Sequence, residues 1–224
     1  EHVRSGGIAV LNGDDSRVAR MAAKVPCRTI TFGSSPGVDL RGTDARSRWP
    51  DRLEFDLETR TGERAHLRSR LVGAHWLPTV LAAVGVAHGL GLAIPEITAR
   101  LEAAEPFSSR MHPMRVPSGA VVLRDELDGS ADTLFAALRV LAEAQARRRM
   151  VVISDVSDYG PEKRRRRLSR LGRECAAAAE VVVFVGDHAE HAAQGGRRRP
   201  GAHRRRRQSR WPGQSSADAR HRRH

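Results

Sequence analysis

The first third of the chain alternates short apolar runs with polar, glycine-containing turns, a pattern typical of α/β proteins. Residues 7–11 and 28–33 are apolar or β-branched and predict two buried strands. Between them, Asp15 is placed to begin a helix over Ser16–Lys24 as its N-cap. A strand, a short helix and a second strand in succession predict a mostly parallel sheet.

A β-hairpin is predicted next. Apolar and polar residues alternate strictly over 53–59 and again over 65–71, on either side of the turn Thr61-Gly62-Glu63. This alternation predicts two paired strands with one solvated face. Residues 34–50, before the hairpin, are polar and dotted with Gly and Pro, so the pattern predicts no element there.

Two helices and a linker complete this half of the chain. The Ala-rich stretch from Trp76 to Gly89 predicts a buried helix, and Pro95 opens a second helix over Ile94–Ala104. The segment 105–109, Glu-Pro-Phe-Ser-Ser, is typical of a linker and marks our candidate domain boundary.

After the linker, strands and helices alternate again. The predicted elements are a strand at 120–123, a helix at 130–146, a strand at 150–153, a helix at 163–180 and a strand at 181–185. This β-α-β-α-β order predicts a second α/β domain with parallel strands.

Charge separates the last thirty residues from the rest. Of the formal net charge of +13, residues 195–224 carry +10, from eleven Arg and one Asp. This tail has no aliphatic residue larger than Ala, so it cannot bury enough surface to offset its chain entropy, and we predict that it is disordered. A sequence this rich in Arg, Gly, Pro and His also results when a GC-rich gene is translated in a shifted reading frame.

Other features exclude several classes of protein. The two cysteines, Cys27 and Cys175, have no metal-ligand spacing, and a reducing cytoplasm is the simplest location. No run of 18 apolar residues predicts a membrane span. The first residues are neither a start methionine nor a signal peptide.

Six segments, in order, resemble the Mur ligase family, and most closely the branch that adds D-alanyl-D-alanine to UDP-MurNAc-tripeptide. In the first half of the chain, the family's "VLNADD" corresponds to residues 9–15, its "FG…D" to Phe32-Gly33 with Asp39, and its "GxHN" to residues 71–75. The motif "GRM" corresponds to residues 109–111, and a "VIDDSYNANP" segment opens at residues 121–125. The last motif, "VLGDMLELG", corresponds to residues 152–160.

The resemblance implies a fold of three parts. Residues 1–107 correspond to the end of a P-loop-type central domain with a β-hairpin. Residues 108–194 correspond to an incomplete, Rossmann-like C-terminal ligase domain, and residues 195–224 form the disordered basic tail. The implied chemistry is formation of an acyl phosphate from ATP, with Mg²⁺, followed by amine attack and release of phosphate. The partners would be a UDP-MurNAc-peptide and an amino acid or dipeptide.

The resemblance also implies site residues at a cleft between the two domains. For ATP they are Arg110, Asp125, His75, Asn12 and Asp14, and for the substrate Asp128 and Ser130. A guanidinium suits phosphate oxygens, and a carboxylate at a strand end suits ribose hydroxyls. Several of these residues also have a purely structural interpretation. Arg110 could be a surface arginine, Asp125 a helix cap and His75 the start of a helix. Asn12 and Asp14 could simply bond the backbone of their own turn.

Three departures limit the activity that we expect. The sequence contains no G-x-x-x-x-G-K-[ST], so we expect no catalysis by this chain and weak or absent ATP binding. Trp76 and Thr79 stand where the family has adenine-reading asparagines, and the substrate loop reads Asp-Glu-Leu-Asp-Gly-Ser-Ala over 125–131. The basic tail stands where further elements of the family's last domain are expected.

Two other functions compete. The arginines of the tail and the cluster Lys163–Arg167 allow a basic nucleic-acid-binding module, for which non-specific, salt-dependent binding is expected. A dehydrogenase-like dinucleotide domain is disfavoured, because no G-x-G-x-x-G follows any predicted strand.

Overall fold

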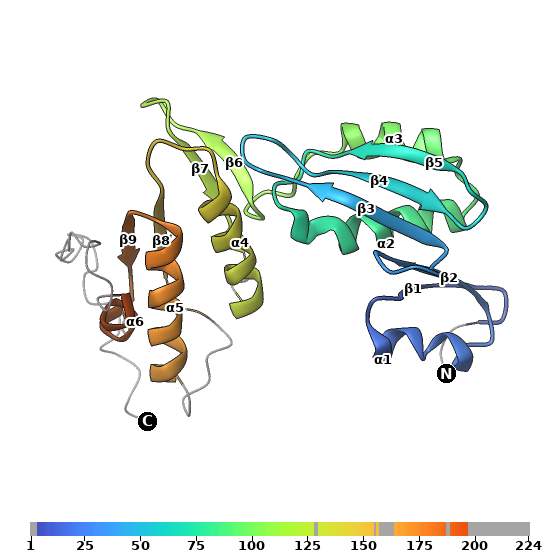
Figure 1. The fold of residues 1–224 in the computed structure, drawn as a ribbon, viewed down its shortest axis with the longest axis horizontal. Coiled ribbons are helices and arrows are strands. Elements are labelled where there is room, and N and C mark those ends of the chain that lie inside the picture. The colour runs from blue at the N-terminus through green and yellow to red at the C-terminus, as the bar shows by residue number, and fades with distance from the viewer. Residues whose placement is uncertain (1–3, 128–129, 155, 157–163, 187–188, 197–224) are drawn as a thin grey trace, which may run out of the picture.

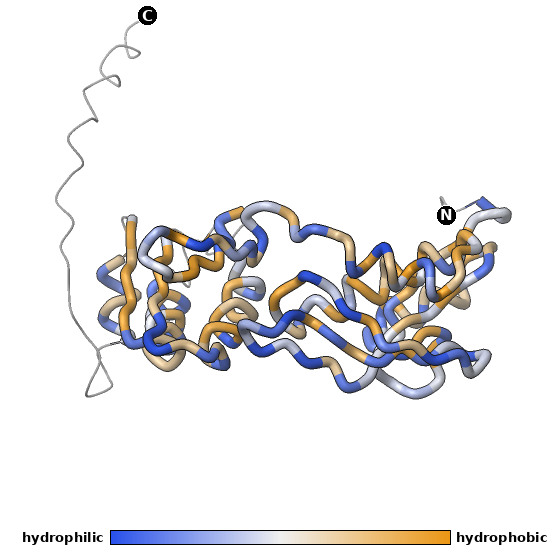
Figure 2. The backbone as a smooth tube through the Cα atoms, turned by 90° about the horizontal axis from the view of Figure 1, so that it is seen from above, coloured by the Kyte–Doolittle hydropathy of each residue, from blue (hydrophilic) through white to orange (hydrophobic). Residues whose placement is uncertain are grey.

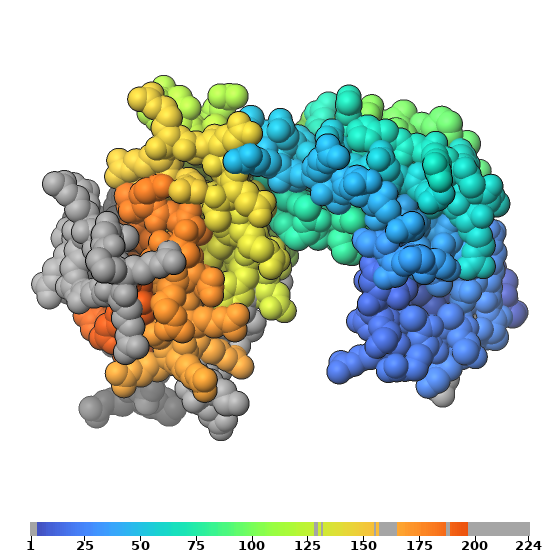
Figure 3. Space-filling view, viewed as in Figure 1, coloured from blue at the N-terminus to red at the C-terminus, as the bar shows by residue number. Residues whose placement is uncertain are grey.

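The computed structural model describes residues 4–127, 130–154, 156, 164–186 and 189–196. It shows an α/β protein of two lobes, each with its own hydrophobic cluster (Figures 1 and 3). We call β1 to α3 the N-terminal lobe and β6 to α6 the C-terminal lobe. In Figure 2, apolar segments occur in both lobes, and many of the stretches between them are hydrophilic.

A five-stranded mixed sheet forms the N-terminal lobe. Its order is β1 (Ile8–Asn12), β2 (Arg28–Gly33), β3 (Leu40–Arg46), β4 (Glu54–Thr59) and β5 (Arg64–Arg68). The first three strands are parallel, and the β4–β5 hairpin extends the sheet in antiparallel fashion. Both the parallel pair and the hairpin confirm the sequence predictions.

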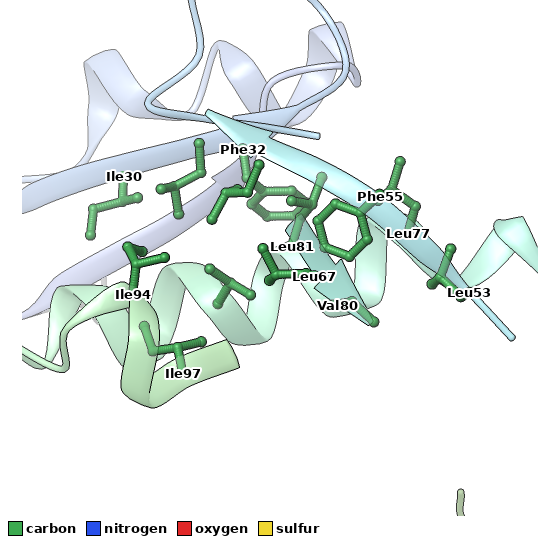
Figure 4. Close-up of a cluster of buried hydrophobic side chains, with 13 residues drawn as sticks. Ile30, Phe32, Leu53, Phe55, Leu67, Leu77, Val80, Leu81, Ile94 and Ile97 are labelled. Atoms are coloured by element: carbon green, nitrogen blue, oxygen red, sulfur yellow. The ribbon is translucent and has the colours of Figure 1, made fainter. Parts of the chain in front are cut away.

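One face of this sheet is covered by two helices, α2 (Leu77–Gly89) and α3 (Ile94–Ala103). Figure 4 shows Leu77, Val80 and Leu81 of α2 against the aromatic rings of Phe32 and Phe55. Ile94 and Ile97 of α3 complete the same cluster. Aliphatic residues dominate this core, as the low aromatic content of the sequence requires.

Two predictions for this lobe were wrong. Residues within 34–50 form strand β3, whose buried positions are Leu40 and Gly42. A β-carbon on Gly42 would lie 3.0 Å from Leu81 Cδ1, so α2 packs directly on this backbone. The predicted helix over Ser16–Lys24 is instead α1 (Ser16–Ala19) and a 3₁₀ turn, η1 (Ala22–Lys24). Because α1 buries none of its residues, no packing extends it.

The C-terminal lobe has two small sheets. An antiparallel pair, β6 (His112–Arg115) and β7 (Val121–Arg124), is followed by α4 (Ala131–Glu143). A parallel pair, β8 (Met150–Ile153) and β9 (Val181–Phe184), is joined by α5 (Arg164–Ala178) and followed by α6 (Ala189–Gly196).

The C-terminal lobe therefore differs from the predicted set of three parallel strands. The last two strands are parallel, but β7 pairs with β6, which the sequence did not predict. Gly195 and Gly196, which we predicted to belong to the disordered tail, instead lie in α6 and are buried. A β-carbon on Gly195 would lie 2.0 Å from the carbonyl oxygen of Ser169, so only glycine allows α6 to pack this closely on α5. Residues 197–224, the rest of the tail, lie outside the described residues.

The β8–β9 sheet is apolar on both faces. Val151, Ile153, Val182 and Phe184 pack into the cluster with α4, α5 and α6. Strand alternation places Met150 and Val152 on the opposite face, and their exposed fractions are 51% and 63%. The division of the chain into domains at residue 107 stays a prediction.

Candidate functional site

Three of the predicted site residues meet where the two lobes join. His75 lies in the 3₁₀ turn η2 (Ala74–Trp76), Arg110 in the segment that connects the lobes, and Asp125 directly after β7. The charges of His75 and Arg110 both act on the Asp125 carboxyl. We call these three residues and their surroundings the junction site. Figure 1 shows β6, β7 and α4 at this meeting of the lobes.

Asp125 is the most constrained side chain of the junction site. It is half-buried, and its Oδ1 accepts a hydrogen bond from the Met111 backbone N–H at 3.0 Å. Burial raises the pKa of Asp125, and the neighbouring charge of Glu126 adds to the rise. The Met111 N–H and the charges of Arg110 and His75 only partly oppose this effect. The carboxylate thus sits in a place that favours added hydrogen-bond donors.

His75 faces Asp125 as a mainly neutral imidazole. Burial lowers the pKa of His75, the nearby Asp125 carboxylate opposes this, and the charge of Arg139 lowers it further. The ring lies 5.4 Å from the Trp76 ring, centroid to centroid. The two rings are tilted by 38° against each other, and Trp76 packs against the core of the N-terminal lobe.

Unusual backbone conformations flank Arg110. Ser109 has φ of 65° and Met111 has φ of 47°, a region that residues other than glycine rarely adopt. Such conformations cost roughly 1–3 kcal/mol each and persist where the surroundings impose them, often at functional sites. Met111 is held by its buried side chain, which is 3% exposed, and by the bond to Asp125.

An apolar cluster joins the lobes beneath these polar groups. Its buried members are Val72, Met111 and Val140, and Trp49, Leu123 and Ala137 pack against them. Arg110 adjoins Met111 in the sequence, and His75 and Asp125 follow Val72 and Leu123 within three residues. The cluster therefore anchors every segment that contributes a polar group to the junction site.

The sequence did not predict a second polar group beside the junction site. Glu126 accepts hydrogen bonds from Ser109 Oγ at 2.8 Å and from Arg124 Nε at 2.9 Å. These bonds lower the pKa of Glu126 to about 2, the Arg124 bond contributing most. No pattern in the sequence marks these common residue types, since only the β6–β7 pairing and the turn at Ser109 bring them together.

Asn12 and Asp14 lie elsewhere, at the end of β1 (Figure 1). Asn12 Oδ1 accepts from the Asp14 N–H at 3.0 Å, and Asp14 accepts from Ser34 N at 2.7 Å and Ser35 N at 3.0 Å. Burial would raise the pKa of Asp14, but these bonds together lower it. Both side chains therefore stabilise the turns after β1 and β2, and their predicted contact with ATP stays a prediction.

Of the two predicted substrate residues, Asp128 lies outside the described residues. Ser130 is the N-cap of α4, where its Oγ accepts from the Thr133 N–H at 3.3 Å. This position puts Ser130 five residues beyond Asp125, at the positive end of a helix dipole.

A shallow depression of about 460 Å³ lies on the polar face of the N-terminal sheet, over β3, β4 and β5. Its charged groups largely satisfy one another, since Arg64 pairs with Glu58 at 2.7 Å and His66 with Asp56 at 2.8 Å. This mutual pairing makes it a poorer candidate than the junction site.

The described residues contain no group of three or more His, Cys, Asp or Glu side chains suited to a metal ion. The resemblance implies Mg²⁺ in the full-length family, with its protein ligands outside this chain. Within the same residues, none of the helices is long and apolar enough to span a membrane.

Comparisons with known proteins agree on one family. Residues 1–87 match the model of the Mur ligase middle domain. The UDP-N-acetylmuramoyl-tripeptide–D-alanyl-D-alanine ligase of Mycobacterium tuberculosis is 27% identical over 194 residues, which is 82% of this chain and 38% of that protein. The 2,6-diaminopimelate-adding ligase of Alkalilimnicola ehrlichii is 31% identical, over 80% of this chain and 36% of that protein. The chain thus spans well under half the length of these relatives.

Solved structures give the same fold. A D-alanyl-D-alanyl ligase from Acinetobacter baumannii superposes with a TM-score of 0.76 at 24% identity, over 87% of this chain and 42% of that one. A pseudomurein peptide ligase from Methanothermus fervidus has a TM-score of 0.61 at 15% identity, over 83% of this chain and 43% of that one. None of these matches favours the nucleic-acid-binding alternative. The family model, the curated relatives and the solved structures agree, and the chain belongs to the Mur ligase family.

Proposed function

We propose that this chain carries the nucleotide-binding junction of an ATP-dependent ligase of peptidoglycan precursor synthesis. The substrate class would be a UDP-MurNAc-peptide joined to an amino acid or to D-alanyl-D-alanine, and the enzyme would act in the cytoplasm. The names of the relatives support this class of substrate. One observation carries the proposal: three residues expected to bind ATP, far apart in the sequence, meet at one interlobe position.

The chemistry of the junction site suits a nucleotide. The Arg110 guanidinium offers planar donors to phosphate oxygens. The Asp125 carboxylate, short of donors and half-buried, suits the hydroxyl groups of a ribose. Neutral His75 and the adjacent Trp76 suit the face of a base. Asn12 and Asp14 for the nucleotide, and Asp128 and Ser130 for the acceptor, remain weaker parts of the proposal.

In the complete reaction, a substrate carboxylate attacks the γ-phosphorus of ATP to give an acyl phosphate and ADP. The amine of the second substrate then attacks the acyl carbon, and inorganic phosphate leaves as the amide forms. Arg110 would stabilise negative charge on phosphate. No step here is assigned to a metal.

Nucleotide binding is testable by NMR on the full chain, labelled with ¹⁵N and ¹³C and titrated with ATP. We expect weak binding, with shifts of the His75 ring and of the Arg110 and Asp125 backbone amides. Asp125→Asn should weaken binding roughly tenfold, the size expected for one lost charge-assisted hydrogen bond. Asp56→Asn, on the polar sheet face, is the matched control and should change nothing. Saturating ATP without shifts at the junction would overturn the proposal.

We also propose that this chain alone does not turn over, because its sequence has no phosphate-cradling P-loop motif. Phosphate release with ATP, Mg²⁺, UDP-MurNAc-tripeptide and D-alanyl-D-alanine should equal the protein-free blank. Release that depends on both peptide substrates would contradict this part of the proposal and leave the nucleotide site intact.

A further inference from the structure

One cation beside the junction site has no role in the function proposed above. Arg139 lies on α4, immediately before Val140, which is buried in the cluster between the lobes. A β-carbon on Gly73 would lie 2.8 Å from Val140 Cγ2, so this turn of α4 packs against the loop that leads to His75. Arg110 bears the same relation to the cluster, as the neighbour of Met111.

Helical spacing puts Arg139 at the rim of this contact. Ala137 and Val140 pack in the cluster between the lobes, and one turn later the carbonyl oxygen of Glu143 accepts a hydrogen bond from Arg48 Nε at 3.0 Å. These three positions form a stripe that faces the N-terminal lobe. Arg139 flanks the stripe and is exposed, so its side chain can reach the mouth of the junction site.

The charge of Arg139 is not neutralised within the described part of the chain. No carboxylate there lies within ion-pair distance of it, whereas Arg124 pairs with Glu126 and Arg149 with Glu180. Val140, its neighbour on α4, packs against the loop that leads to His75, and the charge of Arg139 acts on that ring. An unpaired cation beside a neutral imidazole favours an anionic ligand at this point.

We propose that Arg139 is a second phosphate-binding residue of the junction site, acting with Arg110 from a separate segment of the chain. The inference rests on the proposed nucleotide function and extends it. A polyphosphate carries several negative charges, and two guanidinium groups on separate segments can bind different phosphate oxygens. Because α4 belongs to one lobe and Arg110 to the connection between the lobes, the ligand would also link these two segments.

The test compares Arg139→Ala, Arg139→Lys and wild type in the full chain, with ATP and inorganic tripolyphosphate as separate ligands in NMR titrations. Arg139→Ala should weaken both ligands roughly tenfold to hundredfold, and Arg139→Lys should recover part of the loss, since it keeps the charge without the planar fork. Arg166→Ala removes an equally exposed arginine on α5 and should leave both affinities unchanged. The thermal unfolding midpoint should not move in any variant.

The outcomes separate the two proposals. If wild type binds ATP at the junction and Arg139→Ala binds it equally well, the role of Arg139 is overturned and the nucleotide site stands. If Arg139→Ala loses affinity for ATP but binds tripolyphosphate as wild type does, a contact between Arg139 and phosphate is also overturned. If wild type binds neither ligand at the junction, the nucleotide site itself is overturned, and Arg139 with it.

Discussion

Gly73 is the residue on which the geometry of the junction site most depends. Its φ is 108°, and its N–H donates to the buried Ser47 Oγ at 2.7 Å. A β-carbon there would lie 2.4 Å from the His75 ring and 2.8 Å from Val140. The position thus combines a left-handed backbone with contact to both lobes, and only glycine satisfies both conditions.

Gly73→Ala should therefore destabilise the chain by about 3 kcal/mol, from backbone strain and displaced neighbours together. Gly62→Ala is the matched control, because Gly62 has φ of 88° and no atom within 4 Å of its β-carbon position. Gly62→Ala should lower the free energy of unfolding by only about 1 kcal/mol. Urea unfolding measures both. Equal losses would show that the contact with His75 is unimportant.

The lowered pKa of His75 makes a prediction about acid. Because the unfolded chain regains the ordinary value of 6.5, it takes up the proton first as the pH falls. Folding therefore loses no free energy to this proton at pH values well above 6.5. The free energy of unfolding falls as the pH drops from there toward the folded pKa of His75.

His75→Gln removes this loss. The difference in unfolding free energy between wild type and variant should shift against wild type as the pH falls from about 7.5 to about 5.5. Urea titrations at both pH values measure it, and the other histidines cancel in the comparison. A difference that does not change with pH would contradict the lowered pKa of His75.

At the scale of elements, periodicity predicted most of the fold. In buried strands such as β2 and amphipathic helices such as α4, the apolar residues of the sequence mark the buried positions. The sequence of strand β3 does not mark its buried positions in this way. One of them is Gly42, which is buried because leucine side chains of α2 pack against it. Strand β6 contains Pro113 and only one large apolar residue, and its pairing with β7 defines it.

The turn after β1 gives a prediction at this scale. Asp14 joins β1 to the end of β2 through its bonds to Ser34 and Ser35. Asp14→Ala should cost about 1 kcal/mol at neutral pH, a modest value because the side chain is largely exposed. As its pKa is lowered from 3.8, this contribution is present above that value and disappears as the pH falls through the folded pKa.

Asp51→Ala is the control for this measurement, because Asp51 is exposed and makes no side-chain hydrogen bond among the described residues. Urea unfolding at about pH 7 and about pH 3 should show a smaller loss of unfolding free energy for Asp14→Ala at the lower pH. An equal loss at both pH values would mean that the carboxylate charge does not hold the turn.

At the scale of the whole molecule, the position of the junction site was partly predictable. The order of the motifs indicated Arg110, Asp125 and His75, and folding brings them together. It could not indicate Arg139, because no motif covers the middle of α4 and only the packing of Val140 on the N-terminal lobe brings that residue near.

The lobes themselves are joined through Trp49. Its ring packs on the cluster between the lobes, and its carbonyl oxygen accepts from Gln145 N at 2.9 Å. Trp49→Ala should cost about 2 kcal/mol and split or broaden the single calorimetric transition that we expect for wild type. Phe107→Ala, which removes a ring that is 69% exposed, should leave the transition unchanged. A transition that stays sharp in Trp49→Ala would mean that the lobes are coupled elsewhere.

The outward face of β8 and β9 affects how this protein will behave in common assays. Val152, Met150 and Val185 are 63%, 51% and 46% exposed there. A fully folded chain should therefore bind the dye ANS, a response usually taken as the mark of a molten globule. Val152→Thr should reduce the dye fluorescence while near-ultraviolet circular dichroism stays native. Dye-based thermal shift screens of this protein would begin from a high baseline, and a label-free method would follow its unfolding more faithfully.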